Sequence, residues 1–285
     1  MKRFLLALKI EIFIGLRNSS SKLLLLAPTL FSLLQLLIVK LSQTGQESRD
    51  SLLGRDSFAG ATTENAYGYF VDGMLTGLVV LSLLLTAIAA YSFSNDKEVG
   101  SVRHLVIRGL SRRTIVLAKL VYLHALSIAA LATLFASCYL LSASLWEFGP
   151  IIEDGFELIS EAEIWSEIEL GLGLALLPMP AAIGFALLVS VIAQSATQAV
   201  SVALGLTLLI DVFKSSLGKF AYLHYANFQP SILDQSYLQD VSRLVRGYSD
   251  VLVDQQFFDY NLWTPLPSLA VFLLLTLIVV QRIKL

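Results

Sequence analysis

Six apolar segments, separated by charged stretches, constrain this chain more than any other feature of its sequence. Each segment is close to the ~20 residues that a helix needs to cross a bilayer. They cover residues 23–41, 69–91, 114–142, 170–193, 196–213 and 264–281. A mean hydropathy of +0.73, with only 15% charged residues, is too apolar for a soluble globule. The pattern predicts an all-α integral membrane protein, with six transmembrane helices in a single domain over residues 1–285.

The charges predict the orientation of these helices. With a cytoplasmic N-terminus, the inside holds 13 of the 20 basic residues but only three acids, Glu11, Asp96 and Glu98. A chain of net charge −2 then divides into +10 inside and −12 outside. Because cytoplasmic loops carry the excess of Lys and Arg, we expect both termini in the cytoplasm. The expected outer segments are 42–66, 143–169 and 214–263.

Two features of the spans leave alternatives open. Residues 2–17 are too interrupted by charge to cross the bilayer, and fit either a helix lying in the inner interface or an extension of the first span. In the fourth span, Pro178 and Pro180 must break the hydrogen-bond ladder. They form either a functional hinge or a static kink. Gly73 and Gly77 make a GxxxG pair that would let helices approach closely.

The loop 92–113 is the one substantial cytoplasmic loop that we expect. Asn95 can cap a short helix, with Glu98 reaching back to the cap. Gly109 is a plausible stop, and Ser111 can cap the following helix. The spacing predicts a helix over about 96–108, with an apolar stripe and charges off that stripe. The stripe comprises Val99, Val102, Leu105 and Val106, and the charges are Asp96, Glu98, Arg103 and Arg108.

The expected outer segments are acidic and partly helical. Residues 147–169 carry eight acids and no Lys or Arg. The stretch 157–169 has the spacing of a helix with one apolar face, which comprises Leu158, Ala162, Trp165 and Ile168. The stretch 233–248 has the same spacing in Leu233, Tyr237, Val241, Leu244 and Tyr248, and predicts an interfacial helix. A solvated surface fits better than a metal site here, because there is no D-x-D spacing and no nearby His or Cys.

Motifs for chemistry are missing from the sequence. It has no G-x-x-x-x-G-K-[ST], no HExxH and no G-x-S-x-G, so we expect no catalytic, cofactor or metal site in this chain and no nucleic-acid partner. Asp72 and Asp211 fall at outer ends of spans and Lys119 near an inner end, within reach of water. His124 is placed deep, where a neutral imidazole bonded to nearby backbone is expected.

At loop 92–113 the sequence resembles the permease subunits of type-2 ABC exporters. The similar stretch is AYSFSNDKEVGSVRHLVIRGLSRRTIVLAKLVYLHAL. It contains a Glu-x-Gly pattern (Glu98, Gly100), a Ser-Arg pair (Ser111, Arg112) and a Lys that opens the third span (Lys119). KIEIFIGLRNSSSKLLLL is similar to the family's interfacial helix, and FALLVSVIAQSATQAVSVALG to its hairpin of spans four and five. Where the family has Pro before Ser-Arg, this chain has Gly109–Leu110.

The resemblance implies a non-catalytic subunit of a bacterial inner-membrane exporter. It would pair with a second copy or a paralogue and bind two copies of a separate ATPase, which would hold ATP and Mg²⁺. The loop helix would be the coupling helix that docks into the ATPase, followed by a turn of Gly109, Ser111 and Arg112. The implied docking residues are Asp96, Glu98, Val99, Gly100, Val102, Arg103, Leu105, Val106 and Arg108.

Other interpretations stay open at this point. The loop helix could lie on anionic headgroups instead of docking, or do both. The acidic outer segments could bind a periplasmic protein or simply be solvated. The whole chain could instead be a self-sufficient secondary transporter or channel, or a membrane anchor for a soluble complex. The sequence does not name a substrate.

Overall fold

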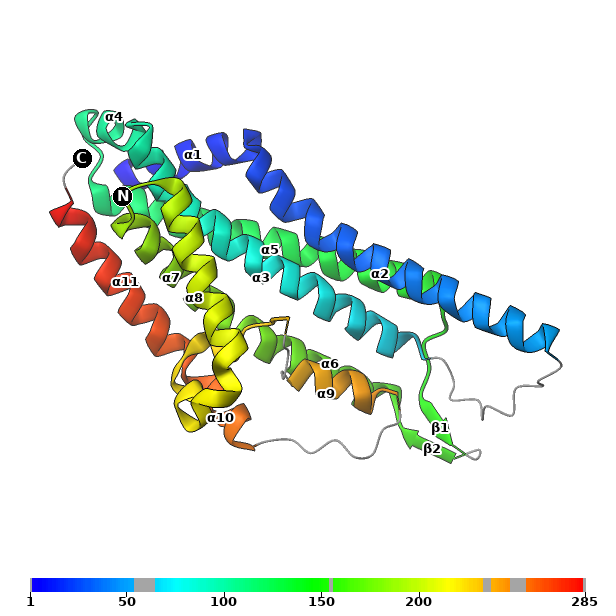
Figure 1. Ribbon diagram of the computed structural model, residues 1–285. Helices are drawn as coiled ribbons and strands as arrows, with labels where there is room; N and C mark the ends of the chain where they lie inside the picture. The colour runs from blue at the N-terminus through cyan, green and yellow to red at the C-terminus, as the bar shows by residue number, and fades with distance from the viewer. Residues whose placement is uncertain (1, 54–64, 154–155, 233–236, 247–254, 284–285) are drawn as a thin grey trace.

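The structure is an all-α bundle with six membrane-length helical stretches (Figure 1). This computed structural model describes residues 2–53, 65–153, 156–232, 237–246 and 255–283, which include one antiparallel hairpin, β1 (Ile151–Glu153) with β2 (Phe156–Ile159). The six stretches are α2 (Ser19–Leu52), α3 (Ala66–Glu98), α5 (Arg112–Leu145), α6 (Glu161–Leu176) with α7 (Pro178–Ile192), α8 (Ala196–Leu217) with η1 (Gly218–Leu223), and α10 (Gln255–Trp263) with α11 (Pro265–Arg282). The prediction of an all-α fold with six span-capable helices is confirmed.

Several of these helices continue beyond the predicted spans. The 34 residues of α2 make a rod of about 50 Å, against the ~30 Å hydrocarbon core of a bilayer. The predicted loop 42–66 is therefore helical as far as Leu52. Thr44 and Ser48 donate to the carbonyls four residues earlier, at 3.1 and 2.7 Å, so the polar side chains follow the helix instead of ending it. Residues 54–64 lie outside the described part.

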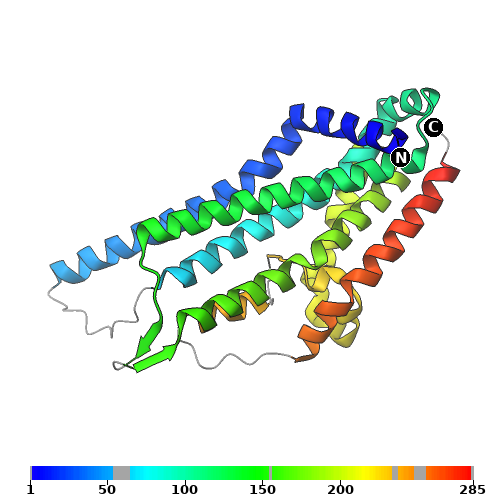
Figure 2. The ribbon, with the colours of Figure 1, turned by 180° about the vertical axis from the view of Figure 1, so that it is seen from behind.

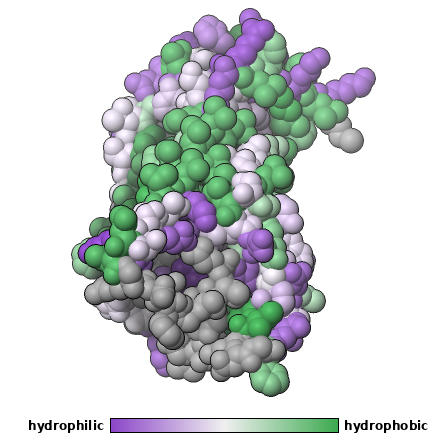
Figure 3. Space-filling view, turned by 90° about the vertical axis from the view of Figure 1, so that its right-hand side faces the viewer, coloured by the Kyte–Doolittle hydropathy of each residue, from purple (hydrophilic) through white to green (hydrophobic). Residues whose placement is uncertain are grey.

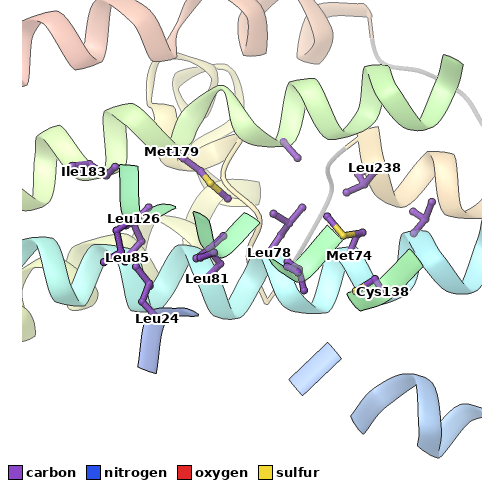
Figure 4. Close-up of a cluster of buried hydrophobic side chains, with 14 of the residues drawn as sticks. Leu24, Met74, Leu78, Leu81, Leu85, Leu126, Cys138, Met179, Ile183 and Leu238 are labelled. Atoms are coloured by element: carbon purple, nitrogen blue, oxygen red, sulfur yellow. The ribbon is translucent and has the colours of Figure 1, made fainter. Parts of the chain in front are cut away.

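The α3 helix is the centre of the bundle. It packs against α2, α5, α7 and α8, and its buried leucines form the main core with Met179 and Ile183 of α7 (Figure 4). Gly73 faces α2, where the Ser32 hydroxyl donates to its carbonyl at 2.7 Å. Gly77 faces α5 so closely that a Cβ there would lie 2.3 Å from Leu134. Both glycines of the GxxxG pair thus serve close approach, each toward a different helix.

The N-terminal segment is a separate helix, α1 (Lys2–Arg17), and not an extension of α2. Asn18 takes an extended conformation between them and caps α2, with its Oδ1 accepting from Ser20 N at 3.1 Å. Ala7, Glu11 and Gly15 face inward at helical spacing, and α1 packs against α5. The other face exposes apolar residues: Leu5, Leu6, Ile12, Phe13, Ile14 and Leu16. An interfacial helix therefore remains the interpretation.

The bundle has two chemically different ends. Both chain termini, α1 and α4 (Ser101–Ile107) lie at one end, which we call the basic end (Figures 1 and 2). The β-hairpin, the start of α6 and α9 (Tyr237–Leu244) lie at the other, the acidic end. Figure 3 shows hydrophobic residues covering the middle of one face, with hydrophilic side chains projecting above them. This distribution suits a protein that crosses a membrane.

The segment after α8 lies in the predicted outer segment 214–263. It forms η1 and η2 (Tyr225–Asn227) and then packs against the middle of α3. Gln229 donates to the Ser82 hydroxyl at 2.8 Å, and that hydroxyl donates to the Pro230 carbonyl at 3.0 Å. Buried backbone needs partners when water is absent, and the polar Ser82 supplies one at mid-helix.

The predicted outer helices are present but differ in extent. The helix expected over 157–169 begins at Glu161, because Ser160 and Glu163 form a capping box and Leu158 belongs to β2. The helix expected over 233–248 is α9, whose Leu238 and Val241 pack against Gly171 of α6. Its apolar face is covered by protein and not by lipid. Leu233 and Tyr248, also placed on that helix, lie outside the described residues.

Candidate functional site at the basic end

The loop helix is shorter than predicted and begins later. The α3 helix continues through Asp96 to Glu98, so Asn95 lies inside it and caps nothing. The break comes at Gly100, whose φ of +79° is left-handed and favours glycine. After this turn, α4 covers only Ser101–Ile107. Asp96 and Glu98 therefore belong to the end of a membrane-length helix, and the residues predicted for one helix are divided between two.

The C-terminal boundary of the loop helix matches the prediction. Gly109 has a φ of +86°, and its N–H donates to the Val106 carbonyl at 3.0 Å. The Leu110 N–H donates to the Leu105 carbonyl at 3.2 Å, which completes a Schellman motif. Ser111 caps α5 by accepting from Thr114 N at 3.2 Å. Two left-handed glycines thus bracket α4 and set its direction relative to α3 and α5.

The apolar stripe of α4 faces the bundle instead of a partner. Val102 is fully buried, and Leu105 and Val106 pack partly around it. The cluster that they join collects residues from six helices: Ala7 (α1), Phe93 (α3), Ile115, Val116 and Ala118 (α5), Val191 (α7) and Val280 (α11), with α4 itself the sixth. Displacement of α4 would therefore disturb most of the basic end.

The opposite side forms what we call the α4 face: Val99, Arg103, His104, Ile107 and Arg108, all exposed. Val99 is 67% exposed and Ile107 is 73% exposed. The prediction included Val99 but missed Ile107. Ile107 lies four residues after Arg103, on the side of the helix away from Val102, and this signal was available in the sequence.

Side chains at the end of α3 form hydrogen bonds with the backbone of the turn between α7 and α8. The Glu98 carboxylate accepts from Ala196 N, the first residue of α8, at 2.8 Å. Lys97 donates to the carbonyls of Val191 and Ala193 in the same turn. Glu98, one of the residues predicted for docking, thus supplies an acceptor for a helix N-terminus, where a negative charge is favourable.

A buried ion triad joins three helices just inside the basic end. The Lys119 ammonium of α5 lies 3.0 Å from Glu11 Oε1 of α1 and 2.6 Å from Asp96 Oδ2 of α3. Lys119 and Glu11 are 4% and 8% exposed. Burial raises the pKa of the Glu11 carboxyl, and the Lys119 charge opposes that rise. The prediction that Lys119 lies within reach of water was therefore wrong, because its ammonium group is buried and paired within the protein.

All three acids that the sequence places among the basic residues of this end therefore have partners within the chain. Glu11 and Asp96 bind Lys119, and Glu98 binds the start of α8. Arg112 is also used internally, since its guanidinium donates to carbonyls at the end of α11, including that of Gln281 at 3.1 Å. The charged side chains of the α4 face itself are Arg103 and Arg108, so its net charge is positive.

The predicted break in the fourth span lies between α6 and α7. Pro178 has no N–H to give the Leu174 carbonyl, four residues earlier. Asn261 of α10, 2% exposed, donates to that carbonyl at 3.1 Å. The sequence did not single out Asn261, because nothing local connects it to a proline 83 positions before it. Leu177 keeps helical backbone angles, so the break is a local interruption between two nearly continuous helices.

Two carboxylates that were predicted at outer ends of spans are paired within the protein, Asp72 with its side chain partly exposed and Asp211 buried. Asp72 binds Arg246 and Ser242. Asp211 is 3% exposed, lies 3.0 Å from Lys214 and accepts from Ser231 at 2.6 Å. His124 Nδ1 lies 2.8 Å from the Leu120 carbonyl, so it contacts nearby backbone as predicted.

Among the described residues, no three or more His, Cys, Asp or Glu side chains come together as a group that could hold a metal ion. In comparisons with known proteins, no protein-family model, no curated protein and no solved structure matches the chain.

Proposed function

We propose that this chain is the membrane-spanning permease subunit of an ATP-driven exporter of a bacterial inner membrane. It would work as a pair of permease subunits with two copies of a separate ATPase, which would hold ATP and Mg²⁺. Both termini would lie in the cytoplasm. The six span-capable helices, the charge division along the chain and the resemblance at loop 92–113 support this proposal.

The α4 face is the observation that carries the proposal. Two apolar side chains, Val99 and Ile107, project at the tip of the basic end with Arg103 and Arg108 around them. Exposed apolar groups in a charged setting are typical of protein-binding surfaces. The back of the same helix is buried through Val102 against residues of five other helices. A partner that moved α4 would therefore also move the spans.

The charges indicate what kind of surface the partner presents. Because Glu98 is bound to α8 and Asp96 to Lys119, the α4 face offers basic and apolar groups but no unengaged carboxylate. We therefore expect an apolar groove with acidic residues at its rim on the ATPase. This changes the predicted docking set: Arg103, Ile107 and Arg108 would make contact, whereas Val102, Leu105 and Val106 would support the helix from behind.

The test is affinity purification of the chain from its host in mild detergent, with mass spectrometry of the proteins that co-elute. We expect a near-stoichiometric protein with a P-loop. Its recovery should fall at least tenfold, about 1.4 kcal/mol of binding free energy, in the variants Ile107→Asp and Arg103→Glu. Lys22→Glu, an exposed charge reversal on α2, is the matched control and should retain the protein.

Two outcomes would contradict the proposal. The α4 variants could retain the ATPase as well as Lys22→Glu does, which would place docking elsewhere. If no ATPase co-elutes under any mild condition and the variants detach instead from anionic vesicles, α4 would be a lipid-binding element.

The secondary-transporter alternative gains one observation, the buried carboxylate of Asp211. Intramembrane carboxylates often carry coupling ions. Here, however, Lys214 already neutralises Asp211 at 3.0 Å, so the pair requires no further cation. Transport by the purified chain alone in liposomes would favour this alternative over the exporter.

A further inference from the structure

A cavity of about 510 Å³ lies toward the acidic end, where it is lined by residues of α3, α5 and α6. Leu131 and Phe135 of α5 form one side, Met74 of α3 the floor, and α6 the other side through Trp165 and Glu169, among others. Its volume lies in the range of sites that bind small organic molecules. No role for this cavity follows from the proposed function.

The course of α6 explains why this space is open. At the acidic end α6 rests on α9, where Leu238 and Val241 fit against Gly171. At its other end it is separated from α7 at Pro178, and Asn261 fixes the freed carbonyl. The helix α6 thus packs against α9 and α10 and does not pack closely against α5. Gly173 faces the gap, since a Cβ added there would meet nothing within 4 Å.

The walls of the cavity combine three kinds of chemistry. Most of the lining is aliphatic, with Met74 and Leu131 on the inner side. Phe135 and Trp165 add two aromatic rings with centroids 6.4 Å apart, and Trp165 is 40% exposed. Glu169 adds a carboxylate, and within the described ranges it has no Lys, Arg or His at ion-pair distance. Its neighbour Glu167, by contrast, is bound by the Tyr237 hydroxyl.

We propose that this cavity binds a hydrophobic organic cation. A carboxylate next to an aromatic ring attracts a positive charge both directly and through the ring face. The aliphatic part would then bury the rest of the molecule. An anion would be repelled, because Glu161 and Glu163 lie on the same helix as Glu169. A lipid acyl chain would use the aliphatic wall but leave the carboxylate without a function.

The order of these groups along α6 also fixes the orientation of the ligand. Glu169 lies about two turns from the start of α6 at the acidic end, and Gly173 lies one turn further in. The charge would therefore sit nearer the acidic end and the apolar part deeper in the bundle. This is the orientation of an amphiphile at a membrane interface.

The experiment is equilibrium binding of radiolabelled tetraphenylphosphonium to the purified full chain in an uncharged detergent. Tetraphenylborate, an anion of the same shape, is the matched ligand. We expect saturable binding of the cation that Glu169→Gln weakens about tenfold through loss of the ion pair and that Gly173→Leu blocks by filling the space. Glu161→Gln removes a carboxylate from the same helix but outside the cavity, and should bind like the wild type.

Equal affinity for tetraphenylborate would overturn the proposal, and so would unchanged cation binding in Glu169→Gln. Either result would identify the cavity as a non-selective apolar groove for lipid chains. Glu169 is exposed, so its variant tests the site even if Gly173→Leu fails to fold. No ATPase takes part in the assay, and the outcome is therefore independent of the exporter proposal.

Discussion

Replacing Lys119 tests whether the buried triad holds the basic end together. Lys119→Met keeps the length of the side chain but leaves Glu11 and Asp96 facing each other without a cation. Removing one member of a buried ion pair typically costs about 3–5 kcal/mol, because the remaining charge is left uncompensated. Glu11→Gln should cost less, about 1.5–3 kcal/mol at most, since Lys119 still holds Asp96 at 2.6 Å.

The assay is unfolding of the purified full chain in detergent, followed by circular dichroism, together with hydrogen exchange of α1. We expect Lys119→Met to have the lowest free energy of unfolding and the fastest exchange in α1. Lys22→Met makes the same chemical change at an exposed site and should stay within about 0.5 kcal/mol of the wild type. The triple variant Glu11→Gln, Asp96→Asn, Lys119→Met removes every charge and should recover most of the loss.

The free energy of unfolding should also depend on pH, in a direction set by the pKa of Glu11. The pKa of Glu11 is already raised by burial, so the folded state binds its proton more tightly than the unfolded state does. Stability then falls as the pH rises from the ordinary Glu pKa through the raised one. Removing the Lys119 charge should enlarge this effect, and the deficit of Lys119→Met should shrink on acidification. A deficit no larger than that of Lys22→Met, at any pH, would show that the triad does not stabilise the basic end.

Three further predictions concern single contacts. Asn261→Leu should lower the free energy of unfolding by about 1–3 kcal/mol, because the buried Leu174 carbonyl loses its donor; Asn261→Gln should differ less if the amide still reaches. Gly15→Ala should be at least as damaging, since the new Cβ would lie 2.0 Å from the Tyr122 hydroxyl oxygen and 2.1 Å from the ring carbon that carries it. Gly15→Ala with Tyr122→Leu, which removes the ring, should recover part of the loss in the same unfolding assay. Burial lowers the pKa of His224 below its ordinary value of 6.5, so the stability that the neutral imidazole contributes should be lost as the pH falls below 6.5. The loss should appear as faster hydrogen exchange around η2, and His224→Asn should abolish this pH dependence.

Local signals in the sequence predicted the parts of the fold that local physics decides. The six apolar segments, the stop at Gly109 and the cap at Ser111 depend on composition or on contacts within four residues. Asn95 with Glu98 also matched a cap, but the helix before it had no reason to end there. The actual break needed the left-handed Gly100, two positions after Glu98.

Contacts between distant segments were beyond such reasoning. Glu11 and Lys119 are 108 residues apart, and their pairing depends on how α1 lies on α5. The re-entry of Gln229 toward Ser82 likewise depends on the space left beside α3. The cavity beside Glu169 exists because α6 packs against α9 and not closely against α5. The periodicity of apolar residues in α6 does not predict this packing.

The charge division along the chain has a consequence that only the structure makes visible. The sequence places three acids among the basic residues of one end, and each of them is bound within the protein: Glu11 and Asp96 by Lys119, and Glu98 by the start of α8. These carboxylates are directed toward Lys119 and the start of α8, so the charged side chains that lie on the α4 face are Arg103 and Arg108. The same three carboxylates also connect α1, α3, α5 and α8 at the basic end. Under the proposed function, a partner attracted by the arginines would contact the helix whose buried side packs against α1, α3 and α5, and this would link electrostatic recognition to movement of the bundle.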